Sequence, residues 1–290
     1  MPLTPAQPDH PGEDDTPRCP NCGGTGWRMI PAGPTAPDGV PVETAGSGSD
    51  PASGEPRLPR AQRCPCQLSA AGEKLAAQAA IPARYKHCTL ENFATESNPG
   101  LQSARLQAAA YVKNYPGGLD RDRNGLVFTG PPGTGKTHLA VAIAQALLER
   151  DFACRFCDYR DLLKRIQATF DPANPATEST VVQPLLAAEV LILDDLGVGR
   201  ATEWAQETLH YLLNHRYSQK LPTIITTNLP DADSRLTRLP NGSEFKADAT
   251  LVDAVGARLR SRLSEMCVFV PVLGSDFRRQ ATAATRPILN

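Results

Sequence analysis

From about residue 82, the chain alternates between short apolar runs and segments whose apolar residues recur every three or four positions. The short runs are typical of buried strands and the longer spacing is typical of amphipathic helices. Residues 137–149 show the helical spacing, because Leu139, Ile143 and Leu147 recur every four residues. The predicted strands are 125–129, 153–157, 190–193, 223–226 and 267–271, and the predicted helices are 101–111, 137–149, 160–170, 203–217 and 254–263. Residues 171–184 are rich in proline and threonine, so they are predicted to form a loop.

Strands that alternate with helices indicate an α/β fold with a largely parallel central sheet covered by helices on both faces. Residues 1–18 and 31–60 contain few large apolar residues and are predicted to be disordered. Residues 67–80 are alanine-rich and are predicted to form a short helix that ends before Pro82. The predicted organisation is a tail (1–18), a cysteine-containing module with a linker helix (19–80) and a globular α/β domain (81–290).

Gly130 to Thr137 fit the phosphate-binding loop pattern at every fixed position. Glycines let the backbone approach a phosphate closely, and the N-terminus of the following helix favours an anion. Lys136 can reach the β- and γ-phosphates, and the Thr137 hydroxyl can bind Mg²⁺. The alternative, a Gly-Pro turn before an ordinary helix, does not explain why a predicted strand precedes the loop. The predicted nucleotide contacts are Gly130, Pro131, Pro132, Gly133, Thr134, Gly135, Lys136, Thr137 and His138.

Polar side chains end the next two buried strands. Asp194 and Asp195 follow the apolar run 190–193, and Asn228 follows the run 223–226. Ligands bind at the carboxyl edge of such sheets, so Asp194 is predicted to hold Mg²⁺ and Asp195 to orient or deprotonate the attacking water. Asn228 is predicted to hydrogen-bond the γ-phosphate or this water. The alternatives are a solvated strand end for the aspartates and an ordinary asparagine turn for Asn228.

Three arginines alternate along the predicted helix 254–263. Arg258 and Arg262 are four residues apart and share a face of the helix. A guanidinium group that reaches the γ-phosphate of a neighbouring subunit would stabilise the transition-state charge. A solvated basic helix face explains the pattern equally well at this point.

Together the phosphate loop, Leu193-Asp194-Asp195-Leu196-Gly197, Thr226-Thr227-Asn228 and the arginine helix resemble the AAA+ ATPases. The closer resemblance is to bacterial helicase loaders of the DnaC and DnaI type and to their transposition-helper relative IstB. Ile81-Pro82-Ala83-Arg84-Tyr85, Leu90-Glu91-Asn92-Phe93, and Trp204, Leu209 and His215-Arg216-Tyr217 also resemble this group. The likeness covers about residues 81–275, and the chain departs from the wider pattern because no room follows the last strand for a helical lid.

This resemblance implies several roles and partners. Arg262 matches the family's arginine finger and Arg258 matches the second basic position, which implies ATP-dependent head-to-tail homo-oligomers. The family's single-stranded DNA path matches residues 159–170, where Arg160, Lys164 and Arg165 would meet phosphates. The alternative for this helix is simple surface packing. The implied partners are a replicative DNA helicase of the DnaB type and single-stranded DNA.

Four cysteines near the N-terminus have a spacing that suits a metal. Cys19 and Cys22 are followed by glycines, and Cys64 and Cys66 come after a gap of 41 residues, most of which belong to the segment predicted to be disordered. Four thiolates suit a closed tetrahedral site, so these residues are predicted to bind Zn²⁺. Unligated thiols and a redox pair are the alternatives. Cys154 and Cys157 lie three apart on a predicted strand, where they face opposite sides and cannot share one ion, so they are predicted to be ordinary thiols.

Composition limits the function classes. The 290 residues carry 30 basic and 31 acidic side chains, so no global charge draws the chain onto nucleic acid. No run is long enough to span a bilayer and no signal peptide is apparent, which predicts a cytoplasmic protein that avoids membranes. No Asn-Lys-x-Asp motif favours GTP, so ATP is the expected nucleotide.

The leading hypothesis is a Mg²⁺-dependent ATPase that loads a helicase. The alternatives are a transposition helper that binds DNA and a transposase, and a non-enzymatic nucleotide-dependent module.

Overall fold

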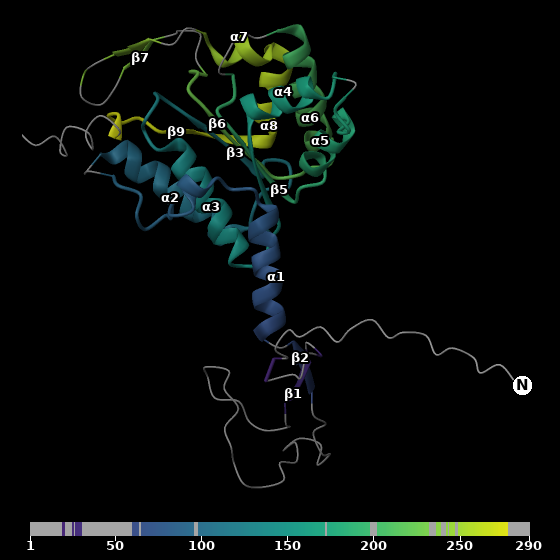
Figure 1. Cartoon of the computed structure of the whole chain (residues 1–290). Helices are drawn as coiled ribbons and strands as arrows, with labels where there is room; N and C mark the ends of the chain where they lie inside the picture. The colour runs from purple at the N-terminus through teal and green to yellow at the C-terminus, as the bar shows by residue number, and fades with distance from the viewer. Residues whose placement is uncertain are drawn as a thin grey trace, which may run out of the picture. The chain divides into compact units, whose positions relative to one another are not determined.

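Five parallel strands form the central sheet of this computed structural model (Figure 1). The strands are β3 (Gly125–Thr129), β4 (Cys154–Asp158), β5 (Val190–Asp194), β6 (Thr223–Thr227) and β9 (Cys267–Pro271). Their order in the sheet is β4-β5-β6-β3-β9, and all neighbouring strands are parallel. The predicted parallel α/β sheet is therefore confirmed, and the carboxyl ends of all five strands lie at one edge.

Helices cover both faces of this sheet (Figure 1). Alternate strand residues point to opposite faces, so Phe128 packs with α2 and α3 while its neighbour Val127 packs in the core on the other side. One face carries α2 (Pro99–Asn114) and α3 (Lys136–Leu148). The other face carries α4 (Tyr159–Ala168), α5 (Glu178–Leu186), α6 (Glu203–Ser218), α7 (Leu251–Val255) and α8 (Ala257–Met266).

The prediction that residues 171–184 form only a loop is wrong, because α5 begins at Glu178. Thr177 caps this helix, since its hydroxyl accepts a hydrogen bond from the Thr180 amide while the Thr180 hydroxyl accepts one from the Thr177 amide. The apolar residues Val181, Val182, Leu185 and Leu186 are buried against the sheet. Helix capping and burial therefore outweigh the cost of Pro184 inside the helix.

The predicted helix 254–263 is two helices in the structure. Gly256 separates α7 from α8 with φ 78° and ψ 153°, a conformation that residues with a Cβ rarely adopt. α7 has its own cap at Thr250, whose hydroxyl accepts a hydrogen bond from the Asp253 amide. The three arginines at 258, 260 and 262 thus belong to a separate short helix that begins after this break.

The structure describes residues 19–20, 25, 27–30, 60–63, 65–95, 98–171, 173–197, 202–231, 236–238, 242, 244–246 and 249–277. The predicted disordered segments, apart from residue 60, lie outside these ranges.

The chain divides into two compact units, residues 1–71 and 72–290. The remaining elements are β1 (Trp27–Ile30), β2 (Arg60–Arg63), α1 (Pro65–Gln78), the 3₁₀ helix η1 (Ala83–Tyr85), β7 (Leu236–Arg238) and β8 (Glu244–Lys246). Within the described ranges, no helix combines the length and apolar character needed to cross a membrane.

The end of α1 lies against β4, the outermost strand on its side of the sheet. The Phe156 amide donates a hydrogen bond of 2.7 Å to the Ala79 carbonyl. The Arg155 guanidinium donates one of 2.7 Å to the Gln78 carbonyl. The residues just after α1 therefore provide an acceptor for the outward-facing edge of the sheet.

Candidate nucleotide site

The phosphate loop lies between the end of β3 and the start of α3. Gly130 has φ 144°, and a Cβ there would lie 2.3 Å from the Val272 carbonyl oxygen. Gly135 has φ 95°, and a Cβ there would lie 2.6 Å from the Phe93 ring. These two positions require glycine because both the backbone conformation and the surrounding space exclude a side chain. The loop can therefore present its backbone N–H groups at the N-terminus of α3.

Lys136 opens α3, and its side chain turns back toward the phosphate loop. The Nζ atom donates hydrogen bonds to the carbonyl oxygens of Gly130 at 2.8 Å and Pro131 at 2.6 Å. The Thr134 hydroxyl donates to the same Pro131 carbonyl at 3.0 Å. The ammonium group is thus held at the loop, beside the N-terminus of α3, where a phosphate chain would bind.

Asp194 is almost fully buried at the end of β5, and two hydroxyl groups contact one of its oxygens. Thr137 Oγ1 donates to Asp194 Oδ1 at 2.9 Å, and Thr226 Oγ1 donates to the same atom at 2.5 Å. Burial raises the pKa of the Asp194 carboxyl above its ordinary value, and these two hydrogen bonds oppose the shift. The Asp194 carboxylate and the Thr137 hydroxyl lie next to each other, and both offer the oxygen ligands that Mg²⁺ prefers.

Asp195 and Asn228 form the second polar pair of the site. Asn228 Nδ2 donates to Asp195 Oδ1 at 2.9 Å, and the Asp195 amide donates to Thr226 Oγ1 at 3.0 Å. Asp195 has φ 59°, which is uncommon for a residue with a side chain and is typical of functional sites. The ends of β5 and β6 are therefore joined through their polar side chains.

A single pocket of about 410 Å³ contains these groups at the carboxyl edge of the sheet. Among the predicted residues it is lined by Pro132, Gly133, Gly135, Lys136, Thr137, His138, Asp194, Asp195 and Asn228. The structure therefore brings the phosphate loop and both strand-end motifs together. The pocket surface also includes Arg84, Tyr85, His87, Cys88, Asp158, Thr226 and Phe277, which were not predicted as site residues.

Contacts with α3 hold the segment around Tyr85 to Phe93 at this pocket. His138 Nε2 lies 2.8 Å from the Thr89 carbonyl oxygen, and the His138 ring meets the Phe93 ring edge-on at 5.3 Å. Burial lowers the pKa of His138, so the neutral ring with a proton on Nε2 suits this contact. Gln145 Nε2 donates to the Cys88 carbonyl at 2.6 Å. The only sequence signal for this wall was its family-like pattern at residues 81–93.

The arginines of α8 do not line this pocket. Arg258 is exposed, and Arg262 donates a hydrogen bond to the Asn214 side chain while its guanidinium lies 5.8 Å from the Tyr217 ring centre. A finger that acts on a neighbouring subunit is not required to reach its own site. The finger role of Arg262 therefore stays a prediction.

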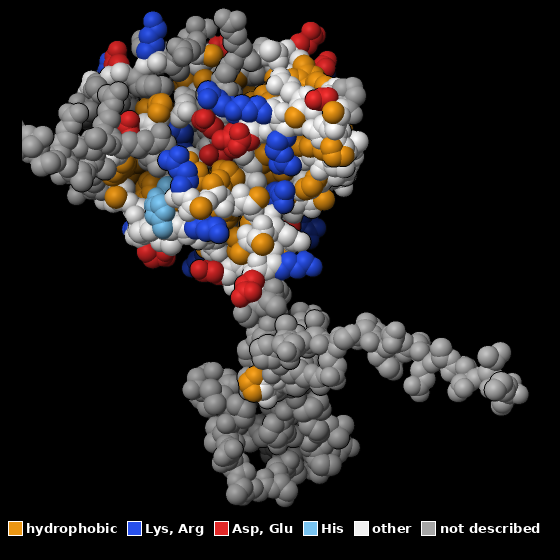
Figure 2. Space-filling view, in the orientation of Figure 1, with side chains coloured by type: hydrophobic (Ala, Val, Ile, Leu, Met, Phe, Trp, Pro, Cys, Tyr) orange, Lys and Arg blue, Asp and Glu red, His pale blue; other side chains and the backbone are white. Residues whose placement is uncertain are grey.

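Basic side chains on α4 are exposed, whereas its apolar side is buried. Arg160, Lys164 and Arg165 face solvent, and Leu162 and Ile166 pack in the core. On the face shown in Figure 2, Lys and Arg side chains are dispersed around a group of acidic side chains. Any contact with nucleic acid on this face is thus local rather than spread over one continuous basic surface.

The described cysteines outside the N-terminal module are core residues. Cys154 and Cys157 pack in the two cores on opposite faces of the sheet, as predicted, and burial raises the pKa of each thiol to about 12. Among the residues that the structure describes, no group of three or more metal-binding side chains occurs. Of the predicted zinc ligands, Cys22, Cys64 and the side chain of Cys66 lie outside what is described, so the zinc site stays a prediction.

Comparisons with known proteins agree with this architecture. Residues 71–285 match the family of IstB-like ATP binding proteins. The replicative helicase loader DnaC of Escherichia coli strain K12 is 28% identical over 144 residues, which are 50% of this chain and 56% of that relative. The chain thus spans little more than half the length of this curated relative. A crystal structure of the DnaC helicase loader matches with a TM-score of 0.52 and 29% identity over 66% of this chain and 99% of that one. A crystal structure of DnaI matches in fold with a TM-score of 0.52 and 21% identity over 66% of this chain and 94% of that one.

Proposed function

Because the chain belongs to the family of IstB-like ATP binding proteins, we propose that it is a Mg²⁺-dependent ATPase that loads or remodels a replicative DNA helicase on single-stranded DNA. The observation that carries this proposal is the single pocket in which the phosphate loop meets Asp194, Asp195 and Asn228. The likeness to the helicase loader DnaC supports the choice of client. In this proposal ATP binding drives assembly, and hydrolysis releases the assembled state.

The pocket residues divide the chemistry among them. The loop amides and Lys136 would hold the triphosphate, and Thr137 and Asp194 would hold Mg²⁺, which supplies neutralisation of the phosphate charge. Asp195 would orient or deprotonate the attacking water, and the Asn228 amide that now contacts Asp195 would hold this water or the γ-phosphate. The short hydrogen bonds already present keep these groups aligned before substrate arrives.

Arg262 and Arg258 would act on the next subunit of a head-to-tail assembly. They lie away from the pocket of their own chain, and the exposed position of Arg258 leaves it accessible to a second copy. A guanidinium group supplied by a neighbour makes hydrolysis depend on assembly. The exposed basic side of α4, with Arg160, Lys164 and Arg165, would contact the phosphates of single-stranded DNA.

The proposal predicts which protein the chain captures. Tagged protein in native lysate with Mg²⁺ and ATP is expected to enrich the replicative ring helicase, as identified by mass spectrometry. The control is Lys136→Ala, which removes the ammonium group from the loop and is expected to abolish nucleotide binding and the nucleotide-dependent part of the capture. Recovery of a transposase in place of the helicase would support the transposition-helper alternative. If calorimetry shows no heat of binding for Mg²⁺ and ATP with the intact protein, the ATPase proposal itself fails.

We also propose a zinc site in the N-terminal unit. β1 and β2 pair antiparallel with Trp27 opposite Arg63. In the sequence, Cys19 and Cys22 precede β1, while Cys64 and Cys66 follow β2. Since Trp27 pairs with Arg63, β1 begins and β2 ends at the same end of the paired strands. The sequence order of the cysteines around these two strands thus supports one shared tetrahedral site.

Purified protein is expected to contain one zinc ion per chain by elemental mass spectrometry. The double variant Cys22→Ser with Cys64→Ser is expected to lose this zinc and still bind ATP, because the nucleotide site belongs to the other unit. Cys157→Ser, which changes a buried thiol of the sheet, is the control and is expected to keep the metal. Zinc-free protein from a reducing preparation that was never exposed to chelator would refute the site.

A further inference from the structure

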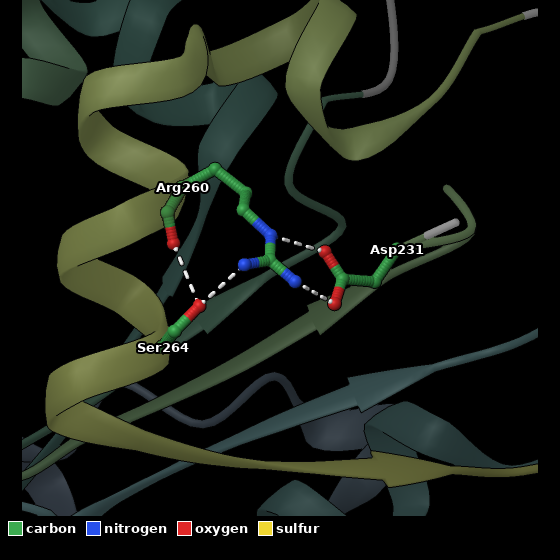
Figure 3. A network of polar contacts seen from close by, with 3 residues as sticks. All are labelled: Asp231, Arg260 and Ser264. Atoms are coloured by element: carbon green, nitrogen blue, oxygen red, sulfur yellow. Dashed lines mark hydrogen bonds and ion pairs between the residues drawn. The ribbon is translucent and has the colours of Figure 1, made fainter. Parts of the chain in front are cut away.

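An ion pair joins α8 to the segment that follows β6. Arg260 Nε donates to Asp231 Oδ1 at 2.8 Å and Nη2 donates to Oδ2 at 2.6 Å, so the pair is bidentate (Figure 3). The third nitrogen, Nη1, donates to Ser264 Oγ at 2.7 Å, and that hydroxyl donates to the Arg260 carbonyl at 3.1 Å. Only 34% of the Arg260 side chain and 21% of the Asp231 side chain are exposed. A bidentate, partly buried pair fixes orientation as well as distance.

Asp231 is only three residues beyond Asn228, and both ends of this short segment are anchored. Asn228 contacts Asp195 in the nucleotide pocket. Leu229 is buried, and the Pro230 carbonyl accepts a hydrogen bond of 3.0 Å from the Leu251 amide at the start of α7. Because only two residues separate Asn228 from Asp231, a displacement of Asn228 is expected to displace Asp231 as well.

Arg260 lies on α8 midway between Arg262, the predicted finger, and Arg258, the predicted second basic position. Residues two apart on a helix do not share a face, so Arg260 holds α8 from a different side than Arg258 and Arg262. α8 is also a separate helix after the break at Gly256. Its direction is thus determined by tertiary contacts such as the Asp231–Arg260 pair and not by continuity with α7.

We propose that the Asp231–Arg260 ion pair is a positioning link between the nucleotide pocket and the arginine helix, an inference that rests on the proposed ATPase function. When a γ-phosphate binds to Asn228, the residues 228–231 move with it. Through the ion pair, this movement displaces Arg260 and changes the direction of α8. The link presents Arg258 and Arg262 to the neighbouring subunit only when the pocket of the same chain is correctly filled. Neither Asp231 nor Arg260 lines the pocket, so neither is a catalytic residue.

Asp231→Asn and Arg260→Gln each remove the charge-assisted pair and leave the pocket residues intact. Mg²⁺–ATP affinity of the dilute variants is expected to equal that of the unaltered protein. Turnover in assembled protein is expected to fall about 3- to 30-fold, the range typical of residues that couple two sites. The matched control is Asp122→Asn, which removes the exposed Asp122–Lys220 ion pair and is expected to leave both quantities unchanged.

Mixing subunits separates this link from a merely structural ion pair. Asp195→Asn subunits are expected to bind Mg²⁺–ATP without hydrolysing it, so they have a filled pocket, an intact link and an intact Arg262. Added to Arg260→Gln subunits, they are expected to restore turnover at the intact sites of the latter. If the pair only stabilised its own chain, the Arg260→Gln pocket would stay impaired and mixing would restore nothing, which would overturn the inference.

Arg262→Ala distinguishes this inference from the proposed function. It is expected to slow turnover of assembled protein by about 10³-fold without weakening nucleotide binding. Normal turnover in this variant would reject the finger assignment itself. Slow turnover with Arg262→Ala but normal turnover with both pair variants would reject only the link. If the pair variants fold poorly, Arg260→Lys keeps the charge without the bidentate geometry, and its full turnover in folded protein would equally reject the link.

Discussion

Asp194→Asn is expected to slow ATP hydrolysis by about 10²-fold or more, because it weakens the proposed Mg²⁺ site, and to make the nucleotide-free protein more stable. The gain in stability arises because Asp194 is 4% exposed and its charge is poorly solvated. Thr137 and Thr226 both donate to the same oxygen, Oδ1. Asparagine keeps an acceptor in that position, so both hydrogen bonds can survive. A gain of about 1 kcal/mol corresponds to a rise in melting temperature of about 2–4 °C for a domain of this size.

The gain in stability is expected to depend on pH. Burial raises the pKa of Asp194 above 3.8, so the folded state binds this proton more tightly than the unfolded state does. The resulting stabilisation of the native protein is complete at low pH and is lost as pH rises through the raised pKa. At pH 7 the full cost of the charged carboxylate is present, and the asparagine variant avoids it. The difference in free energy of unfolding is therefore expected to shrink as pH falls toward 3.8.

Thermal melts without nucleotide and steady-state phosphate release measure the two effects of Asp194→Asn. Asp122→Asn is the control, because the Asp122 side chain is 75% exposed and its loss should change neither quantity. An asparagine variant that is less stable than the unaltered protein at pH 7 would contradict the account of burial. Full hydrolysis in that variant would contradict the metal-binding role.

Arg216→Leu is expected to lower the free energy of unfolding by about 3–5 kcal/mol, because several buried oxygens lose a charged donor and each group left unsatisfied costs about 1–3 kcal/mol. Arg216 on α6 is fully buried, and burial lowers the pKa of its guanidinium to about 10, which keeps it charged at pH 7. The group donates to the carbonyl oxygens of Leu185, Ala188 and Pro222 and to the Thr223 hydroxyl at 2.6–2.9 Å. Leucine would leave these buried oxygens without their donor.

Urea unfolding measures this loss of stability. Arg216→Lys is the matched variant, and it is expected to be intermediate because an ammonium group keeps the charge but cannot reach all four acceptors. A loss of less than about 1 kcal/mol for Arg216→Leu would mean that water replaces the guanidinium at little cost. Arg216 would then not be a major support of the junction between α5, α6 and the start of β6.

Much of the fold could be predicted because it follows from local pattern. Apolar runs bounded by turns predicted all five strands of the central sheet to within one residue at either end. The helix α5 was missed because Pro184 and the neighbouring threonines read as turn residues, although Thr177 and Thr180 form a cap. The break at Gly256 was missed because the apolar spacing continues through it, although Gly256 has the positive φ that ends α7.

The site residues likewise fall into those that local sequence predicts and those that long-range contacts place. Asp194, Asp195 and Asn228 could be predicted because they lie where β5 and β6 end, at the same edge of the sheet. Lys136 and Thr137 could be predicted because they complete the phosphate-loop pattern that follows β3. The wall around Tyr85 could not, because it is placed by contacts such as His138–Thr89, whose partners are 49 residues apart. The same holds for Asp231 and Arg260, which are 29 residues apart and have no motif of their own.

The contact between Ala79 and β4 matters for how the nucleotide-binding unit should be isolated. β4 ends the sheet, and an outermost strand with unpaired amides is a template on which other chains can aggregate. The Ala79 carbonyl occupies the Phe156 amide and so blocks part of that template. A fragment that starts at residue 81 would discard this protection, whereas one that starts at residue 72 would retain it and is the better choice for a soluble preparation.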